Sequence, residues 1–141
     1  MRSIIVHLRD VTEAKVADFL SQHYPPMSGW AAPWTIPLDN FPVLFIDIYR
    51  DTSSEFEVEG WVALIECLGI EPSVSVNADV SGRYLGDEQV RDFACRLLSA
   101  FVGVAEDDYS EHFWTRDEIA SRQLFDGHPF FDYKSFRLPK Q

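Results

Sequence analysis

The side chains best suited to chemistry in this sequence lie in one stretch, Glu106–Ile119, which combines acidic and aromatic residues with the start of a helix. Catalysis by paired carboxylates would need an apolar pocket around two of these acids, because adjacent acids in a solvated loop are ordinarily both ionised. Recognition of another protein needs only aromatic anchors inside an acidic rim. We therefore expect a partner-binding surface at Asp107, Asp108, Tyr109, Glu111 and Trp114, with a solvated turn as the alternative.

Other reactive patterns are weaker. A metal site would have to combine His112 with Asp107 and Asp108, joined by Asp126 and His128, and the sequence lacks the ligand spacings of zinc and calcium sites. A nucleophilic serine needs a neighbouring base and an oxyanion hole, but Ser81 precedes Gly82 in a turn and not in a strand-to-helix elbow. We expect no catalytic residue, no metal and no cofactor.

Two tryptophans support a second interpretation. Trp30 and Trp34 lie in a proline-rich segment, Tyr24–Pro42, which is predicted to be a loop. They could cover the core, or they could form a lid over the sheet for a small-molecule ligand or a weakly enzymatic site. A third interpretation is a homo-oligomer whose acidic segments are only its solvated outside.

The charge of the chain restricts its partners. Twelve Lys and Arg against 23 Asp and Glu give a net charge of −11, which repels nucleic acid and anionic membranes and attracts a basic protein. A second acidic segment, Asp51–Glu71, contains six acids and no base. The apolar run near the first residue is too short for a signal peptide, and Cys67 and Cys95 fall in apolar helical patterns. We expect a cytoplasmic protein with reduced, buried cysteines.

The length and composition predict a single domain over residues 1–141, because 141 residues with 46% hydrophobic side chains can bury one core. Periodicity and capping patterns predict its elements in order. The first half contains a strand at Ile4–Leu8, a helix from Thr12 ended by Pro25 and Pro26, a strand at Val43–Tyr49, and a helix from the Ser54–Glu57 capping box to Gly69. A strand at Ser73–Ser81 and a helix at Asp87–Phe101, stopped by a left-handed Gly103, come next. The last elements are a short strand at Val102–Ala105, a helix from Thr115 to Phe125, and a segment at Phe130–Tyr133 that docks on the core.

This order fits either a three-layer α/β fold with a parallel sheet or a two-layer α+β sandwich. The segment Ser73–Ser81 alternates apolar and polar residues, which indicates a strand with one wet face. Parallel sheets are normally covered on both faces. We therefore expect an α+β fold: a small, mainly antiparallel sheet with helices packed on one face, in a ferredoxin-like two-layer sandwich.

The C-terminal half resembles small uncharacterised bacterial proteins, some of immunity-protein type from toxin–antidote systems. The resemblance lies in Asp79-Val80-Ser81-Gly82-Arg83, Gly86-Asp87-Glu88-Gln89-Val90, Asp107-Asp108-Tyr109-Ser110 and Trp114-Thr115-Arg116-Asp117-Glu118-Ile119. It implies a cytoplasmic antidote that neutralises a toxin by occlusion, and it supplies no catalytic residue. The leading hypothesis is therefore a non-enzymatic acidic protein-binding domain.

Overall fold

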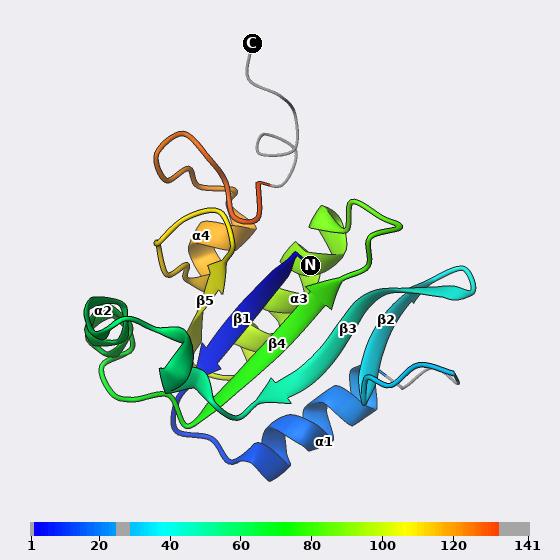
Figure 1. Cartoon of the computed structure of the whole chain (residues 1–141), viewed down its shortest axis with the longest axis horizontal. Helices are drawn as coiled ribbons and strands as arrows, with labels where there is room; N and C mark the ends of the chain where they lie inside the picture. Colours follow the sequence, from blue (N-terminus) through cyan, green and yellow to red (C-terminus); the bar gives the residue numbers. More distant parts are fainter. Residues whose placement is uncertain (1, 25–28, 133–141) are drawn as a thin grey trace.

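The computed structural model of the chain describes residues 2–24 and 29–132 (Figure 1). Pro25, Pro26 and Tyr133 lie outside the described residues. The elements are β1 (Ser3–Leu8), α1 (Glu13–His23), β2 (Trp34–Leu38), β3 (Phe41–Tyr49), the 3-10 turn η1 (Thr52–Glu55), α2 (Val58–Leu68), β4 (Val74–Val80), α3 (Asp87–Ala100), β5 (Gly103–Asp107) and α4 (Arg116–Ala120).

The described strands form one antiparallel sheet with the order β2-β3-β4-β1-β5. Strand β4 lies between β1 and β3, and β1 lies between β4 and β5, so each of two β-α-β units is split by a strand of the other. This is the ferredoxin-like arrangement, with β2 added at one edge and α2 inserted between β3 and β4. The expected α+β sandwich is confirmed, and the three-layer parallel alternative is wrong.

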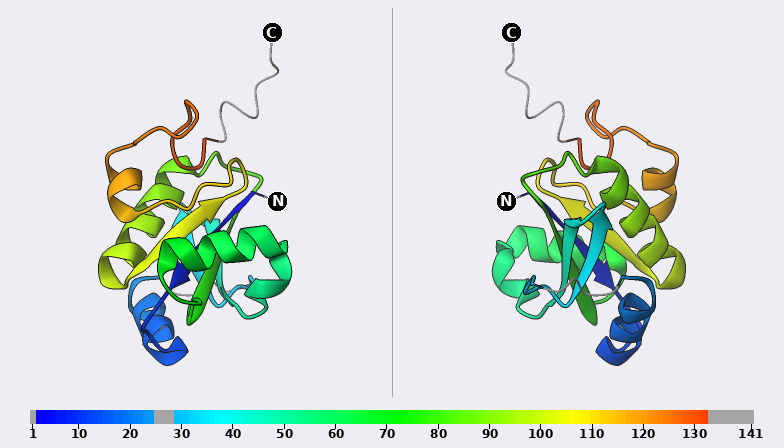
Figure 2. Two further views of the ribbon diagram at one scale, coloured as in Figure 1. Left: turned by 90° about the vertical axis from the view of Figure 1, so that its left-hand side faces the viewer. Right: turned by 90° about the vertical axis from the view of Figure 1, so that its right-hand side faces the viewer.

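One face of the sheet carries the main core. Side chains alternate along a strand, so Ile4, Val6 and Leu8 of β1 point to the same side, where they join one buried cluster with residues of α1 and α3. Helix α3 presents the predicted stripe of Val90, Phe93, Ala94, Leu97 and Leu98 to this cluster. The two side views of Figure 2 place α1, α3 and α4 on this face and α2 on the opposite one.

The opposite face is covered only in part. Leu64 and Leu68 of α2 form a second small cluster with Val104 of β5, and half-buried Phe56, Trp61 and Phe113 pack against it. The polar side of β4 behaves as predicted at Asn77 and Asp79, which are half-exposed, but Ser75 is buried beneath the end covered by α2. The rest of this sheet face is turned toward the viewer in Figure 1.

The start of α2 differs from its prediction. The helix begins at Val58 with Glu57 as its N-cap, which makes no side-chain capping bond, so the Ser54–Glu57 capping box is wrong. Phe56 is extended and packs against the second cluster, and this contact excludes it from a helix. Val58 is 75% exposed and Val62 46% exposed, contrary to the predicted apolar face. The predicted stop at Gly69 is confirmed by its left-handed backbone.

The predicted loop Tyr24–Pro42 is wrong in its second half, because it contains β2 and the start of β3. Pro37 and Pro42 led to the loop prediction, because proline is rare inside strands. Pro37 lies in an edge strand next to a shift in register, where a missing N–H is tolerated, and Pro42 lies near the start of β3. Trp34 is therefore a strand residue.

Three further expectations need correction. Gly103 does not stop α3 in a left-handed conformation but begins β5. Helix α4 ends at Ala120 and not at Phe125, because the chain turns through a left-handed Arg122. Cys67 is exposed, whereas Cys95 is half-buried. The capping box at Thr115 is confirmed, as is the docking of Phe130 and Phe131, which are both buried.

Candidate functional site

The acidic ridge, defined as residues 106–112, is a turn held by the carboxylate of Asp107. The carboxylate of Asp107 at the end of β5 accepts hydrogen bonds from the backbone N–H groups of Tyr109 and Ser110, both at 3.1 Å. Its second oxygen accepts from the buried N–H of Phe131 at 2.7 Å. Burial raises the pKa of Asp107, although these hydrogen bonds act in the opposite direction. Asp107 thus fixes the shape of the ridge and joins it to the C-terminal segment.

The predicted contact residues divide into two groups. Asp108 and Glu111 are exposed and present their carboxylates at the surface, whereas Tyr109 is half-buried and its hydroxyl oxygen is buried. Asp107 and Trp114 are buried. Trp114 is only 1% exposed because its backbone pairs with Ala105 of β5 and its ring packs on Phe130. Its side chain therefore belongs to the main core.

A cavity that we call the inner groove lies between the ridge and the first turns of α2. It encloses about 530 Å³. Aromatic and small side chains supply its apolar walls, and acids supply its polar surface. The lining residues are Phe56, Glu57, Glu59, Gly60, Ala63, Glu106, Asp107, Ser110, Glu111 and Phe113.

A second cavity, the outer pocket, lies on the other side of the ridge and encloses about 440 Å³. Its far wall is a tight hairpin turn in which Phe125 and His128 exchange backbone hydrogen bonds and Asp126 and Gly127 are left-handed. Four of the five predicted contact residues line this pocket, namely Asp107, Tyr109, Glu111 and Trp114. The fifth, Asp108, lines a small depression of about 150 Å³ on the open sheet face.

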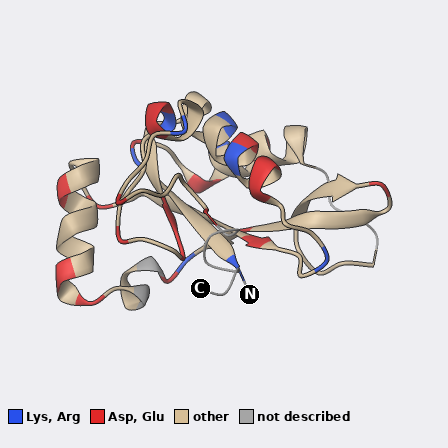
Figure 3. Ribbon diagram, turned by 90° about the horizontal axis from the view of Figure 1, so that it is seen from above, with Lys and Arg blue, Asp and Glu red and all other residues tan. Residues whose placement is uncertain are grey.

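The charge around the ridge has one sign. Among the described residues, no Lys or Arg lines the inner groove or the outer pocket. Figure 3 shows acidic segments and no basic segment along α2, which forms one wall of the groove. Burial raises the pKa of Asp108, against a hydrogen bond from the Ser3 N–H. A cation entering either cavity would therefore meet carboxylates, with no Lys or Arg among the described lining residues to compete with it. The acids that line the two cavities are Glu57, Glu59, Glu106, Asp107, Glu111 and Asp126.

A fully buried histidine lies behind the inner groove. His7 of β1 is 0% exposed, and its Nδ1 lies 2.9 Å from the Oγ of Ser75 on β4. Its Nε2 faces Glu106 of β5, with 3.5 Å between Nε2 and Oε2. The rings of Phe56 and Phe113 lie 5.8 Å and 6.3 Å from the imidazole. The imidazole is thus enclosed by Ser75, Glu106 and the two aromatic rings.

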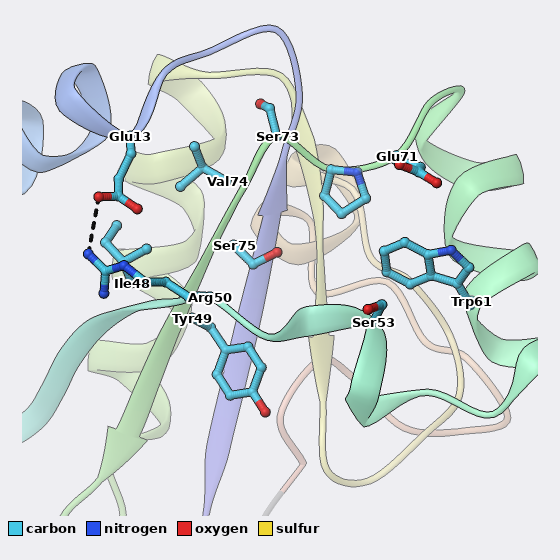
Figure 4. Close-up of a pocket in the computed structure, with 11 residues that line it drawn as sticks. Glu13, Ile48, Tyr49, Arg50, Ser53, Trp61, Glu71, Ser73, Val74 and Ser75 are labelled. Carbon is cyan, nitrogen blue, oxygen red and sulfur yellow. Dashed lines mark hydrogen bonds and ion pairs between the residues drawn. The ribbon is translucent and has the colours of Figure 1, made fainter.

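Ser75 also lines a third cavity, a cleft of about 420 Å³ shown in Figure 4. Trp61 and Glu71 stand on one side of this cleft, and an ion pair between Arg50 and Glu13, at 3.1 Å, stands on the other. Ser75 and His7 therefore form a hydrogen-bonded pair, with a carboxylate on the far nitrogen of the ring. The backbone of Ser75 belongs to the strand ladder between β1 and β3, so its own N–H is not available to an oxyanion.

The two tryptophans of the alternative interpretation do not converge. The ring of Trp30 packs on Phe45, with 5.3 Å between centroids, on the open face of the sheet. Trp34 pairs with Ile46 on the helix-covered face, and its indole N–H donates to the Oγ of Ser21 at 3.0 Å. Phe45 and Ile46 are neighbours on β3 and point to opposite faces of the sheet. Trp30 and Trp34, which lie beside them, therefore cannot form one lid.

The end of the ridge is tied to the helix that follows it. The Nε2 of His112 lies 2.9 Å from one carboxylate oxygen of Glu118, and the other oxygen accepts a hydrogen bond from the Thr115 N–H. Burial acts to raise the pKa of Glu118, but these hydrogen bonds prevail and hold it below its usual range. The ring of Phe125 stacks on His112 at 4.4 Å. His112 is thus engaged in local structure.

Within residues 2–24 and 29–132, no group of three or more His, Cys, Asp or Glu side chains is arranged to hold a metal ion. No described helix has the length and apolarity needed to cross a membrane. Comparison of the chain with protein-family models, with curated proteins and with solved structures gave no match.

The sequence predictions missed the groove although its acids were visible. Glu57 and Glu59 belong to the acidic segment Asp51–Glu71, and Glu106 begins the other acidic segment. Only the fold brings the two segments to opposite walls of one cavity. The buried His7 gave no signal, because a single histidine in an apolar strand pattern is usual for a core residue.

Proposed function

We propose that the protein binds a basic segment of another protein at the acidic ridge, with cationic side chains of the partner entering the inner groove. The observation that carries this proposal is a cavity of about 530 Å³ with apolar walls and only acids among its charged lining residues. Carboxylates attract and orient cations, while Phe56 and Phe113 offer apolar surface to the aliphatic part of Lys or Arg. No catalytic step is required.

Two features support a protein partner over a small cation. The ridge is flanked by cavities on both sides, so an extended segment could contact both across Ser110 and Glu111. Exposed apolar side chains also continue from the groove along α2, at Val58 and Val62. The excess of acids over the whole chain would steer a basic partner toward this surface.

The immunity-type resemblance gives the proposal a narrower form. In that form the partner is a bacterial toxin with a basic surface, the complex forms in the cytoplasm, and binding blocks the toxin by occlusion. Rigid local structure at the ridge supports this form, because a preorganised surface loses little entropy on binding.

The test uses a short fluorescein-labelled peptide of alternating arginine and glycine, with glutamate replacing arginine in a control peptide. The triple variant Glu57→Gln, Glu59→Gln, Glu111→Gln removes three charges from the groove and should weaken binding of the arginine peptide about tenfold, as loss of close charge pairs does. The matched variant Asp18→Asn, Asp39→Asn, Glu88→Gln removes the same charge from exposed positions on α1, the β2–β3 turn and α3. It should cost about twofold at most, because distant exposed charges are screened.

The readout is fluorescence anisotropy at physiological salt. Equal losses in the two triple variants would mean that only net charge attracts the peptide and would contradict a groove-specific site. Binding of the glutamate peptide with similar affinity would contradict the proposal outright.

A further inference from the structure

We infer that His7 is a buried positioning residue for Glu106 and that protonation of His7 lowers the affinity of the inner groove for a cationic partner. This inference rests on the proposed function, because it concerns the regulation of the same groove. It adds a residue that does not line the groove.

The geometry leaves one nitrogen of His7 directed at the groove's acid. The ring is 0% exposed, and Nδ1 is engaged by the Ser75 hydroxyl at 2.9 Å. Within the described part of the chain, buried Nε2 makes no hydrogen bond of normal geometry. Its neighbour is Glu106, whose Oε2 lies 3.5 Å away, which is within ion-pair range although too long for a good hydrogen bond.

The contact determines which nitrogen carries a proton. If Nε2 were unprotonated, its lone pair would face the carboxylate of Glu106, and two acceptors would oppose each other. The neutral ring therefore holds its proton on Nε2 and accepts from the Ser75 hydroxyl at Nδ1. In both this tautomer and the imidazolium, an N–H points at Glu106 and holds its carboxylate at the rear wall of the groove.

The other groups around the ring do not replace Glu106. Ser75 of β4 is uncharged, and the side chains contributed before α2 and after the ridge are the rings of Phe56 and Phe113. Val104 of the second cluster pairs with His7 in the β1–β5 register. Among the described residues, Glu106 is the charged group placed within ion-pair distance of His7.

Glu106 is consequently shared between two cations. Its side chain is 22% exposed and lines the inner groove, so it can pair with a partner's Lys or Arg. A protonated His7 pairs with the same carboxylate from behind, neutralises it and repels the incoming cation. Cation binding and protonation of His7 therefore oppose each other, so the affinity for a cationic partner should fall as the pH is lowered.

The first test measures binding of the arginine peptide between pH 8 and pH 5.5 for the wild-type protein and for His7→Gln, which keeps hydrogen-bonding groups but does not titrate. The wild-type affinity should fall about tenfold more over this range than that of the variant, since protonation of His7 then opposes one close charge pair. The other three histidines, His23, His112 and His128, are present in both proteins, so the comparison isolates His7. An identical pH profile in the two proteins would overturn the inference.

The second test needs no peptide and does not depend on the folding of a His7 variant. The ring nitrogens of His7 are followed by NMR during pH titration of the free wild-type protein and of Glu106→Gln. The His7 ring signals should respond to pH differently in the variant, because the Nε2–H loses the carboxylate that it faces. An identical response in the two proteins would overturn the pairing.

The two tests separate the inference from the proposed function. If the wild-type protein does not bind the arginine peptide at any pH, the proposed function fails and the regulatory half of the inference fails with it. The NMR titration still decides whether His7 and Glu106 are coupled.

Discussion

Replacing Asp107 by alanine should lower the free energy of unfolding by about 3 kcal/mol, because each buried donor that loses its acceptor costs about 1–3 kcal/mol. Three backbone N–H groups, those of Tyr109, Ser110 and Phe131, lose their acceptor together. The Phe131 N–H is buried, so water cannot readily replace the carboxylate there. The loss would loosen the ridge and the docked C-terminal segment at once. Urea unfolding followed by tryptophan fluorescence measures the change.

The neighbouring acid is the matched control. Asp108 is exposed and accepts a hydrogen bond from the Ser3 N–H at 2.8 Å. Asp108→Ala should therefore cost less than about 1 kcal/mol, the usual net value of one accessible hydrogen bond. If the two alanine variants unfold at the same urea concentration, Asp107 does not organise the ridge.

The second large effect is expected at Gly103, where β5 begins. A methyl group there would lie 2.1 Å from the backbone oxygen of His7 and 2.9 Å from a methyl of Leu8. The first of these neighbours belongs to the backbone of β1, so relief requires the two strands to separate. Gly103→Ala should destabilise the protein by about 3 kcal/mol, at the upper end of what overpacking costs. It should also disturb the register that places His7 beside Glu106.

Gly82 provides the comparison, because a methyl group there would meet nothing within 4 Å and its backbone is not left-handed. Gly82→Ala should change the free energy of unfolding by no more than about 0.5 kcal/mol. Both variants are measured by urea unfolding, and the His7 ring signals report the register. A Gly103→Ala protein as stable as Gly82→Ala would show that β1 and β5 are not packed as described.

Much of the fold follows from local patterns in the sequence. The caps at Thr12 and Thr115 were identified from residue type alone, and both side chains accept the expected backbone N–H. The alternation in β4 was enough to choose the two-layer sandwich. These features are set by neighbours a few residues apart, which is the range over which a sequence pattern carries information.

The wrong predictions lie where contacts between residues far apart in the sequence determine the local structure. The capping pattern at Ser54 competes with the burial of Phe56 against His7, and the tertiary contact prevails. Strand β2 is held by pairing with β3 in spite of Pro37. Neither contact can be recognised from the residues of its own segment alone.

The site was predictable only as a region. The acidity of residues 106–112 was evident, but the sequence could not show that Asp107 and Trp114 face inward while Asp108 and Glu111 face outward. His7 and Ser75 are separated by 68 residues and meet only because β1 pairs with β4. Such a group becomes recognisable once the strand order is known.

The most direct test of basic-partner binding in the inner groove is an NMR titration of the wild-type protein with the arginine peptide. Amide shifts should move first and furthest at Gly60, Ala63, Glu111 and Phe113, which line the groove. The amides of Arg50 and Ser53, in the separate cleft of Figure 4, should stay unchanged. Shifts spread evenly over all acidic surfaces, or confined to that cleft, would contradict the account.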